Sequence, residues 1–243
     1  MSGRSAKLAA LFSLALCCAP SAFARTQNFF TGTPLGLGFK AGLEKSPRTD
    51  FLVDPQKVDG TYGKFFAFEP FLDFGNFILR VSGAIHNYPL FSADGNDGSG
   101  AFSETSDASS FAYGIQLLLV PFYSENFLHR TYIVLGGSNV STSLKNSRTY
   151  TAGSTTYTEK AKGSGQEYIA GAGYEFFFVQ NYSMQFELGY RKYTVDKFTY
   201  GTEGDLTGKS RSQGETVVKA DSGLVKKFHH ETPYAAFSLN LNF

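Results

Sequence analysis

The last ten residues of the chain alternate strictly between two kinds of side chain. Ala235, Phe237, Leu239, Leu241 and Phe243 are apolar, whereas the residues between them are small or polar. Successive side chains of a β-strand point to opposite faces, so this alternation predicts a strand with one apolar and one polar face. The alternation reaches the final residue, and we expect the strand to include it.

Seven further segments show the same period. Each is about ten residues long, the length of a tilted strand that crosses a membrane. With the last one, the segments span residues 35–44, 62–73, 77–86, 111–122, 131–140, 167–178, 184–193 and 234–243. The pattern is weakest at 131–140. We predict an all-β chain that forms a transmembrane antiparallel up-and-down β-barrel of eight strands.

Short and long connections alternate between these segments. The short ones lie near residue 75, at 124–129 and at 180–183, and the long polar ones at 45–61, 87–110, 141–165 and 194–232. Single-chain bacterial membrane barrels have short periplasmic turns and long extracellular loops. The spacing therefore favours a barrel with both termini on the periplasmic side.

Two alternatives remain open from the sequence. Residues 215–219 and 224–228 flank a turn-like segment, so a further hairpin would give ten strands. A soluble β-sandwich or lipocalin-like barrel would also alternate, with its apolar face turned to a core. We favour the membrane barrel because the apolar faces are almost free of charge, and an Arg or Lys at mid-depth on a lipid face costs about 2–4 kcal/mol.

The first 24 residues have the layout of a secretory signal peptide. Arg4 and Lys7 form a basic start, residues 8–18 form an apolar run, and residues 22–24 read Ala-Phe-Ala, a small-x-small cleavage site. The run is too short for a membrane-spanning helix, which needs about 20 residues. We expect residues 1–24 to be removed and residues 25–243 to form one barrel domain; an uncleaved amphipathic anchor is the alternative.

Composition excludes several function classes. Cys17 and Cys18 both lie in the expected signal peptide, so the mature chain has no thiol chemistry. The 22 basic and 21 acidic residues nearly balance, which argues against a nucleic-acid partner. The 25 Phe and 14 Tyr without a long apolar stretch are expected for strands that are apolar on one face.

The signal peptide, the eight alternating segments and the terminal Phe243 together resemble the small outer-membrane barrels of the OmpA transmembrane-domain, OmpX and OmpW type. The resemblance is one of pattern and covers nearly all of the mature chain. It implies a location in the bacterial outer membrane, with both termini periplasmic. It also implies that the barrel-assembly machinery recognises the terminal strand through Phe237, Leu239, Leu241 and Phe243.

Ten titratable side chains are expected to point into the barrel. They are Lys40, Glu44, Glu69, Asp73, Arg80, His86, Glu167, Glu175, Glu187 and Arg191. Buried charges must be paired, because breaking a buried pair costs several kcal/mol. We interpret the set as a salt-bridge network that fills the lumen. The alternative is a narrow ion pathway whose acidic excess favours cations.

An enzymatic role has one candidate residue. Barrels of this size include lipid A-modifying enzymes, and such chemistry needs a His beside a Ser or a carboxylate. His86 lies where Glu167 or Ser82 could approach it, but no catalytic motif surrounds it. The neighbouring His229 and His230 would face opposite sides of a strand. We therefore expect no enzyme, no metal site and no cofactor, with the lipid A-modifying enzyme as second alternative.

Basic residues collect in the long connections and near the predicted extracellular rim. They include Lys145, Arg148, Lys160, Lys162, Lys192, Lys197, Lys209, Arg211, Lys226 and Lys227. This distribution suits contact with outer-membrane lipids, above all anionic lipopolysaccharide. Solvated surface charge without a partner is the alternative. Our preferred interpretation is a monomeric, non-enzymatic barrel that acts in membrane integrity or through loops that contact an extracellular ligand. A small-solute or ion channel is the alternative.

Overall fold

The computed structural model describes residues 35–45, 62–124, 128–179, 181–201, 205–206, 208–218, 223–225 and 227–243. These residues form nine strands: β1 (Leu35–Lys45), β2 (Tyr62–Asp73), β3 (Phe77–Asp97), β4 (Gly100–Tyr123), β5 (His129–Tyr150), β6 (Thr155–Val179), β7 (Tyr182–Val195), β8 (Phe198–Tyr200) and β9 (Phe228–Asn242). The signal peptide predicted at 1–24 lies outside the described residues. In the described part of the chain, no helix is long and apolar enough to cross a membrane.

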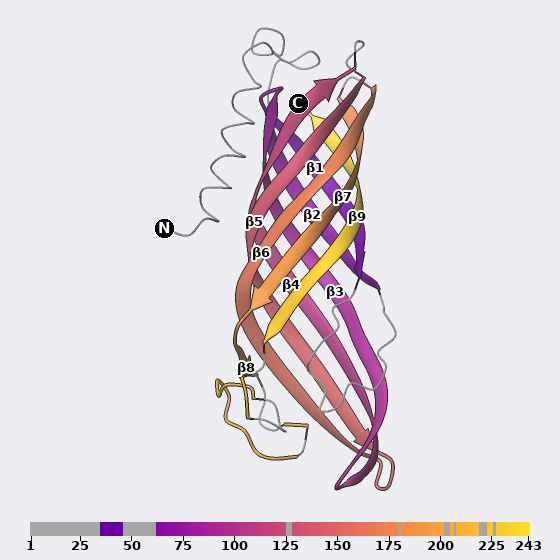
Figure 1. Ribbon diagram of the computed structural model, residues 1–243, viewed down its shortest axis with the longest axis vertical. Coiled ribbons are helices and arrows are strands. Elements are labelled where there is room, and N and C mark those ends of the chain that lie inside the picture. The colour runs from indigo at the N-terminus through magenta and orange to yellow at the C-terminus, as the bar shows by residue number, and fades with distance from the viewer. Residues whose placement is uncertain are drawn as a thin grey trace, which may run out of the picture.

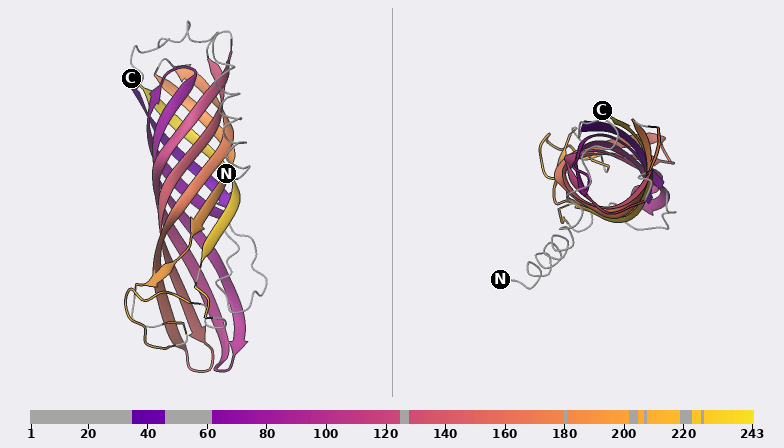
Figure 2. Two further views of the ribbon diagram at one scale, coloured as in Figure 1. Left: turned by 60° about the vertical axis from the view of Figure 1, so that its left-hand side comes forward. Right: turned by 90° about the horizontal axis from the view of Figure 1, so that it is seen from above.

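Eight of the described strands close into an antiparallel barrel (Figure 1). The sheet runs in the order β5-β4-β3-β2-β1-β9-β7-β6, and pairing of β5 with β6 closes the ring, which is seen end-on in Figure 2. The prediction of eight strands is confirmed. In the described residues, the segments considered for a further hairpin form the isolated bridge Val218↔Val225 rather than two more strands of the ring.

The first and last strands of the barrel pair along their length. Phe39 of β1 lies opposite Leu239 of β9, and Ala41 lies opposite Phe237. The amide of Phe243 donates a hydrogen bond to the carbonyl oxygen of Leu35 at 2.9 Å. The alternating segment at the end of the sequence is therefore a complete strand of the ring.

The connection between β2 and β3 is tight because of Gly75. Its φ of +83° lies in the left-handed region, which an L side chain enters at a cost of roughly 1–2 kcal/mol. Its amide donates to the Asp73 carboxylate at 2.8 Å. We call the end of the barrel that carries this connection, and those of β4–β5 and β6–β7, the turn end; the opposite end is the hairpin end.

At the hairpin end, the predicted loops are wrong in part. The stretches 87–110 and 141–165 are paired strands, with Asn96 opposite Ala101 in the β3–β4 hairpin and Tyr150 opposite Thr155 in the β5–β6 hairpin. Figure 1 shows both hairpins projecting well beyond the other strands. The apolar alternation stops where these hairpins begin, but the backbone pairing continues.

The outer face of the ring carries an apolar belt. Among its most exposed side chains are Phe39, Phe66, Ile115 and Leu188, with exposed fractions of 57–68%. The residues predicted to point into the barrel alternate with these exposed side chains along the strands, as with Lys40 beside Phe39 and Glu187 beside Leu188. Toward the turn end, the belt is bordered by aromatic rings, namely Phe74, Phe122, Phe178, Tyr182 and Phe243.

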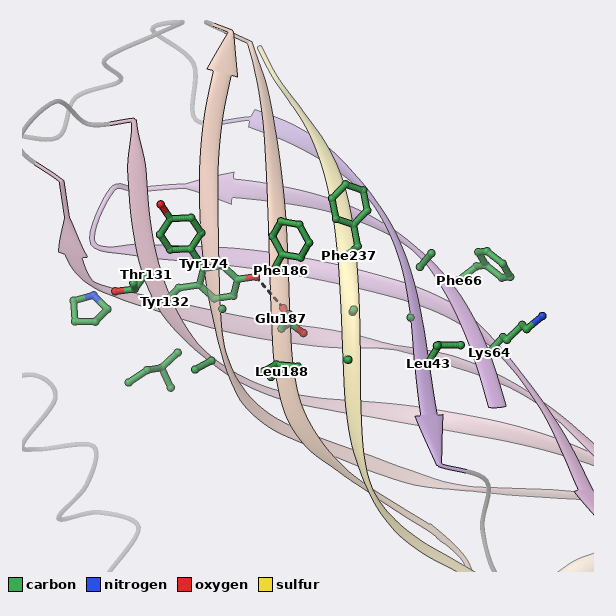
Figure 3. Close-up of a pocket in the computed structure, with 18 residues that line it drawn as sticks. Leu43, Lys64, Phe66, Thr131, Tyr132, Tyr174, Phe186, Glu187, Leu188 and Phe237 are labelled. Carbon is green, nitrogen blue, oxygen red and sulfur yellow. Dashed lines mark hydrogen bonds between the residues drawn. The ribbon is translucent and has the colours of Figure 1, made fainter. Parts of the chain in front are cut away.

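Polar residues border the belt on the hairpin side. Asn87, Ser109 and Gln166 are exposed there, and the Lys192 ammonium pairs with the Glu231 carboxylate. Within the belt, Tyr174, Phe186 and Phe237 project from β6, β7 and β9 beside an outer groove of about 980 Å³ (Figure 3). The outside of the barrel is thus apolar over a band of limited height.

Candidate functional site

The inner face of the barrel carries all ten side chains predicted for the lumen. Nine of them are buried, with exposed fractions of at most 4%, and Asp73 is partly buried. The barrel is therefore inverted relative to a soluble one, with charges inside and apolar side chains outside. Contacts among these groups divide them into three clusters along the barrel axis.

The central ring consists of Lys40, Glu69, Arg80 and Glu187, which come from β1, β2, β3 and β7. The Lys40 ammonium lies 3.0 Å from the Glu69 carboxylate and 3.1 Å from that of Glu187. The Arg80 guanidinium lies 3.2 Å from Glu69 and 3.3 Å from Glu187. Two cations and two carboxylates thus alternate in a closed square across the lumen.

Neutral side chains complete the coordination of this ring. Tyr234 donates to the Glu187 carboxylate at 2.8 Å, and Tyr132 donates to it at 3.3 Å, the contact drawn in Figure 3. Arg80 also donates to Gln185 at 2.7 Å and to Gln116 at 3.2 Å. Hydrogen bonds of this kind are what make a buried ion pair tolerable.

The turn-end cluster consists of Arg130, Asp73 and Glu175. The Arg130 guanidinium lies 2.6 Å from each of the two carboxylates, and it also lies over the Phe177 ring at 5.1 Å. Arg130 is absent from the predicted set because it lies one residue before the strand predicted at 131–140. Tyr132 and Arg130 are two residues apart and therefore share the inner face of β5, so a strand prediction that began at residue 130 would have included Arg130.

The hairpin-end cluster consists of Arg191, Glu44, Glu167 and His86. Arg191 lies 2.8 Å from Glu44 and 2.7 Å from Glu167, and His86 Nδ1 lies 2.8 Å from Glu44. The guanidinium of Arg191 also packs over the Phe65 ring at 4.3 Å, a cation–π contact.

His86 has a different partner from the two that the enzyme hypothesis considered. Its carboxylate neighbour is Glu44, whereas Glu167 pairs with Arg191 and the Ser82 hydroxyl donates to Glu69. Tyr88 and Tyr193 pack on the imidazole, with ring centroids 6.0 and 5.5 Å away. This geometry gives His86 a structural place in the ion-pair network.

An apolar layer lies toward the hairpin end of this network. Val195, Phe198, Val217 and Phe228 are each at most 2% exposed and belong to one packed cluster with Tyr88 and Tyr193. His229 and His230 face opposite sides of β9, as their adjacency predicts. In the described part of the chain, no three His, Cys, Asp or Glu side chains gather closely enough to hold a metal ion.

The terminal-strand residues predicted as an assembly signal share the outer face of the barrel. Leu239 and Phe243 are exposed, and Phe237 and Leu241 are partly exposed. Their recognition by assembly machinery stays a prediction.

Comparison with known proteins finds likeness in solved structures. No protein-family model matches the sequence, and a search of curated proteins gives no match. OprG, an outer membrane protein of Pseudomonas aeruginosa, has a TM-score of 0.46 at 12% identity, over 87% of this chain and 97% of that one. Ail, the attachment invasion locus protein of Yersinia pestis, gives 0.41 at 10% identity over 86% and 97%. Neisserial surface protein A gives 0.38 at 12% identity over 87% and 98%.

Proposed function

We propose that this protein is an integral β-barrel of the bacterial outer membrane, with its hairpin end outside the cell. The support is the apolar belt, which would face lipid, together with the charged interior. In water, such a belt would be an exposed apolar surface of a size that soluble monomers rarely present. Purified protein should run faster on gels before boiling than after, and surface protease should cleave the β3–β4 and β5–β6 hairpins on intact cells.

Within the membrane, we propose a closed, non-enzymatic barrel that holds its projecting hairpins in a fixed position. The observation that carries this proposal is the central ring, in which Lys40, Glu69, Arg80 and Glu187 bridge four strands across the lumen. The interior of an eight-stranded barrel is just wide enough for side chains to fill. The interacting surface is then the paired extension of β3–β6, which meets the cell exterior.

Two measurements test this role. Planar-bilayer recordings of refolded protein should show no discrete conductance. Shortening the β5–β6 hairpin by joining Ser143 to Lys162 through a two-residue turn should leave folding intact and abolish attachment of cells to surfaces. Unchanged surface binding by the shortened protein would contradict the proposed role of the hairpins.

A cation channel is the second candidate, and a specific observation favours it. The three lumen clusters hold six carboxylates, those of Glu44, Glu69, Asp73, Glu167, Glu175 and Glu187, against the four cations of Lys40, Arg80, Arg130 and Arg191. Small discrete current steps with cation selectivity in the same recordings would support this candidate and overturn the closed barrel.

A further inference from the structure

We propose that the outer face of β4, β5 and β6, just beyond the belt, is a docking groove for a phosphorylated glycolipid of the outer leaflet. The proposal rests on the membrane placement proposed above and adds a partner and a site to it. Three observations carry it: a run of small residues on β5, two adjoining concavities, and a lysine cluster at the hairpin side of the groove.

The floor of the groove is β5. Its outward residues from 137 to 143 are all small or of moderate size: Gly137, Asn139, Ser141 and Ser143. The neighbouring strands carry large aromatic residues on the same face, with Phe111 and Tyr113 on β4 and Tyr168 on β6, each at least 50% exposed. A shallow channel therefore follows β5 out of the belt, with Phe111 and Tyr113 on its β4 side and Tyr168 on its β6 side at the end nearest the belt.

The part of the groove nearest the belt is polar and uncharged. It is a concavity of about 430 Å³ lined by Tyr113, Asn139, Ser141, Ser164 and Gln166, among others. The Tyr168 hydroxyl donates to Gln166 Oε1 at 2.6 Å, which leaves the amide nitrogen of Gln166 as a donor for a ligand. Hydroxyl and amide groups beside aromatic rings are suited to hydrogen-bonding the hydroxyls of a sugar.

The next part of the groove is basic. A concavity of about 480 Å³ is lined by Lys145, Lys160 and Lys162, and Asp107 is the one carboxylate among its lining residues. Lys145 lies directly opposite Asp107 in the β4–β5 ladder and opposite Lys160 in the β5–β6 ladder, and Lys162 lies opposite Ser143. Like charges directly opposite on neighbouring strands are destabilising. A bound anion would offset this repulsion.

The three lysines of the groove outnumber its one carboxylate, that of Asp107. The lysines of the groove are concentrated on one face with an excess of positive charge, a distribution that attracts a multiply charged anion.

The order of these features along the strands identifies the occupant. Moving out from the belt, a ligand meets apolar and aromatic side chains, then hydroxyl and amide groups, then ammonium groups. Ser141 and Lys145 are four residues apart, roughly 13 Å along the strand. Acyl chains, sugar and phosphate occur in that order in a phosphorylated lipopolysaccharide, with its acyl chains in the membrane. A free phosphate would use the lysines alone.

Binding to the refolded barrel in phosphatidylcholine nanodiscs tests the proposal. The probes are rough lipopolysaccharide with a phosphorylated inner core, the same lipopolysaccharide after chemical dephosphorylation, and inorganic phosphate. The test variant is K145Q/K160Q/K162Q. The matched control, K64Q/K209Q/K227Q, removes the same charge from exposed lysines outside the groove. Heat-modifiable migration of each variant confirms that the barrel is folded.

The groove variant should bind the phosphorylated lipopolysaccharide at least about tenfold more weakly than the unmodified protein, because charge-assisted contacts are lost. The control should change the affinity less than about twofold, since remote surface charges are screened. Ser141→Phe, which fills the uncharged part, should weaken binding of both lipopolysaccharide forms. Equal weakening by the two lysine variants, or inorganic phosphate competing fully with lipopolysaccharide, would overturn the proposal.

The outcome is separable from the membrane placement. If the protein is heat-modifiable and surface-exposed on cells but binds lipopolysaccharide equally well with and without the three lysines, the proposed location stands and the proposed groove is wrong. If the protein is absent from the outer membrane, the proposed location and the proposed groove are both wrong.

Discussion

Glu187 lies in the central ring and contacts four side chains of the lumen. Its carboxylate meets Lys40, Arg80, Tyr132 and Tyr234. Glu187→Ala should lower the free energy of unfolding by about 3–5 kcal/mol, because it leaves buried cations without their counter-charge. Urea unfolding of the barrel in lipid vesicles measures the loss.

Two further variants show whether this loss comes from burial of charge. Lys40→Met combined with Glu187→Gln removes one charge of each sign and should recover a large part of the stability. Glu231→Gln breaks the exposed pair with Lys192 and should cost less than about 1 kcal/mol. A similar cost for Glu187→Ala and Glu231→Gln would show that the central ring adds nothing to stability.

His230 makes stability depend on pH at the hairpin end. It lies beyond the belt, beside the exposed Lys192–Glu231 pair, and packs on the rings of Tyr88 and Tyr193. Burial lowers the pKa of His230 to about 4, from an ordinary value near 6.5. Between these values the unfolded chain binds the proton more readily, so stability is full above pH 6.5 and falls toward pH 4.

The expected loss from His230 is on the order of 2 kcal/mol across this window. It is measured as the unfolding free energy at pH 7, 5.5 and 4.5. His230→Phe keeps an aromatic ring in place without a titrating group, so its unfolding free energy should fall less steeply with acid. If the two proteins lose stability in parallel, His230 is not the group responsible.

At the scale of the elements, the β3–β4 and β5–β6 hairpins should be rigid rather than loop-like. Residues 102–110 and 141–150 are paired on both edges, by β3 and β5 or by β4 and β6. Their amides should exchange with deuterium at least about a hundredfold more slowly than those of residues 209–213, which form no strand, because exchange requires opening of the ladder. Mass spectrometry after pulse labelling measures this, and equal exchange would contradict the paired hairpins.

The same hairpins show where sequence reasoning stops. An apolar alternation marks a strand where one face meets lipid, and this located all eight strands of the ring. Beyond the belt, the outer face is polar and the inner face mixes apolar with polar side chains. Lys145 points outward, Leu144 belongs to the buried apolar layer, and Asn146 is buried inside, where it bonds to Ser106 and Glu159. The side chains then give no period of two, although Ser and Thr remain compatible with strands.

The residues of the candidate site could also be predicted only in part. Within the predicted strands, parity alone identified which charges point inward, because each strand has only two faces. The buried Glu104, Arg148 and Glu159 lie outside those predicted strands. Parity could not say which charges meet, since that depends on the stagger between strands and on contacts across the lumen. Lys40 and Glu187, for instance, are 147 residues apart in sequence. Arg130 was not predicted because the predicted strand begins at residue 131, one residue after it.

At the scale of the whole molecule, the depth of the barrel in the bilayer follows from where the belt ends. Ile115 and Ser109 both point outward from β4, and their six-residue separation is roughly 20 Å along the strand. Ile115 lies within the belt and Ser109 on its polar border. Ile115→Arg should therefore cost about 2–4 kcal/mol of unfolding free energy in vesicles, and Ser109→Arg about 0–1 kcal/mol.

This pair of substitutions adds the same side chain to the same face of the same strand, so strand propensity and charge are matched. The two costs should converge in bilayers thin enough to leave Ile115 close to the interface, because water then reaches the guanidinium. Equal costs in a bilayer of ordinary thickness would mean that the belt does not lie across the hydrocarbon. Agreement with the expected gradient would fix the polar border at the headgroups, which is the depth at which the lysines of the β5–β6 groove can reach phosphate.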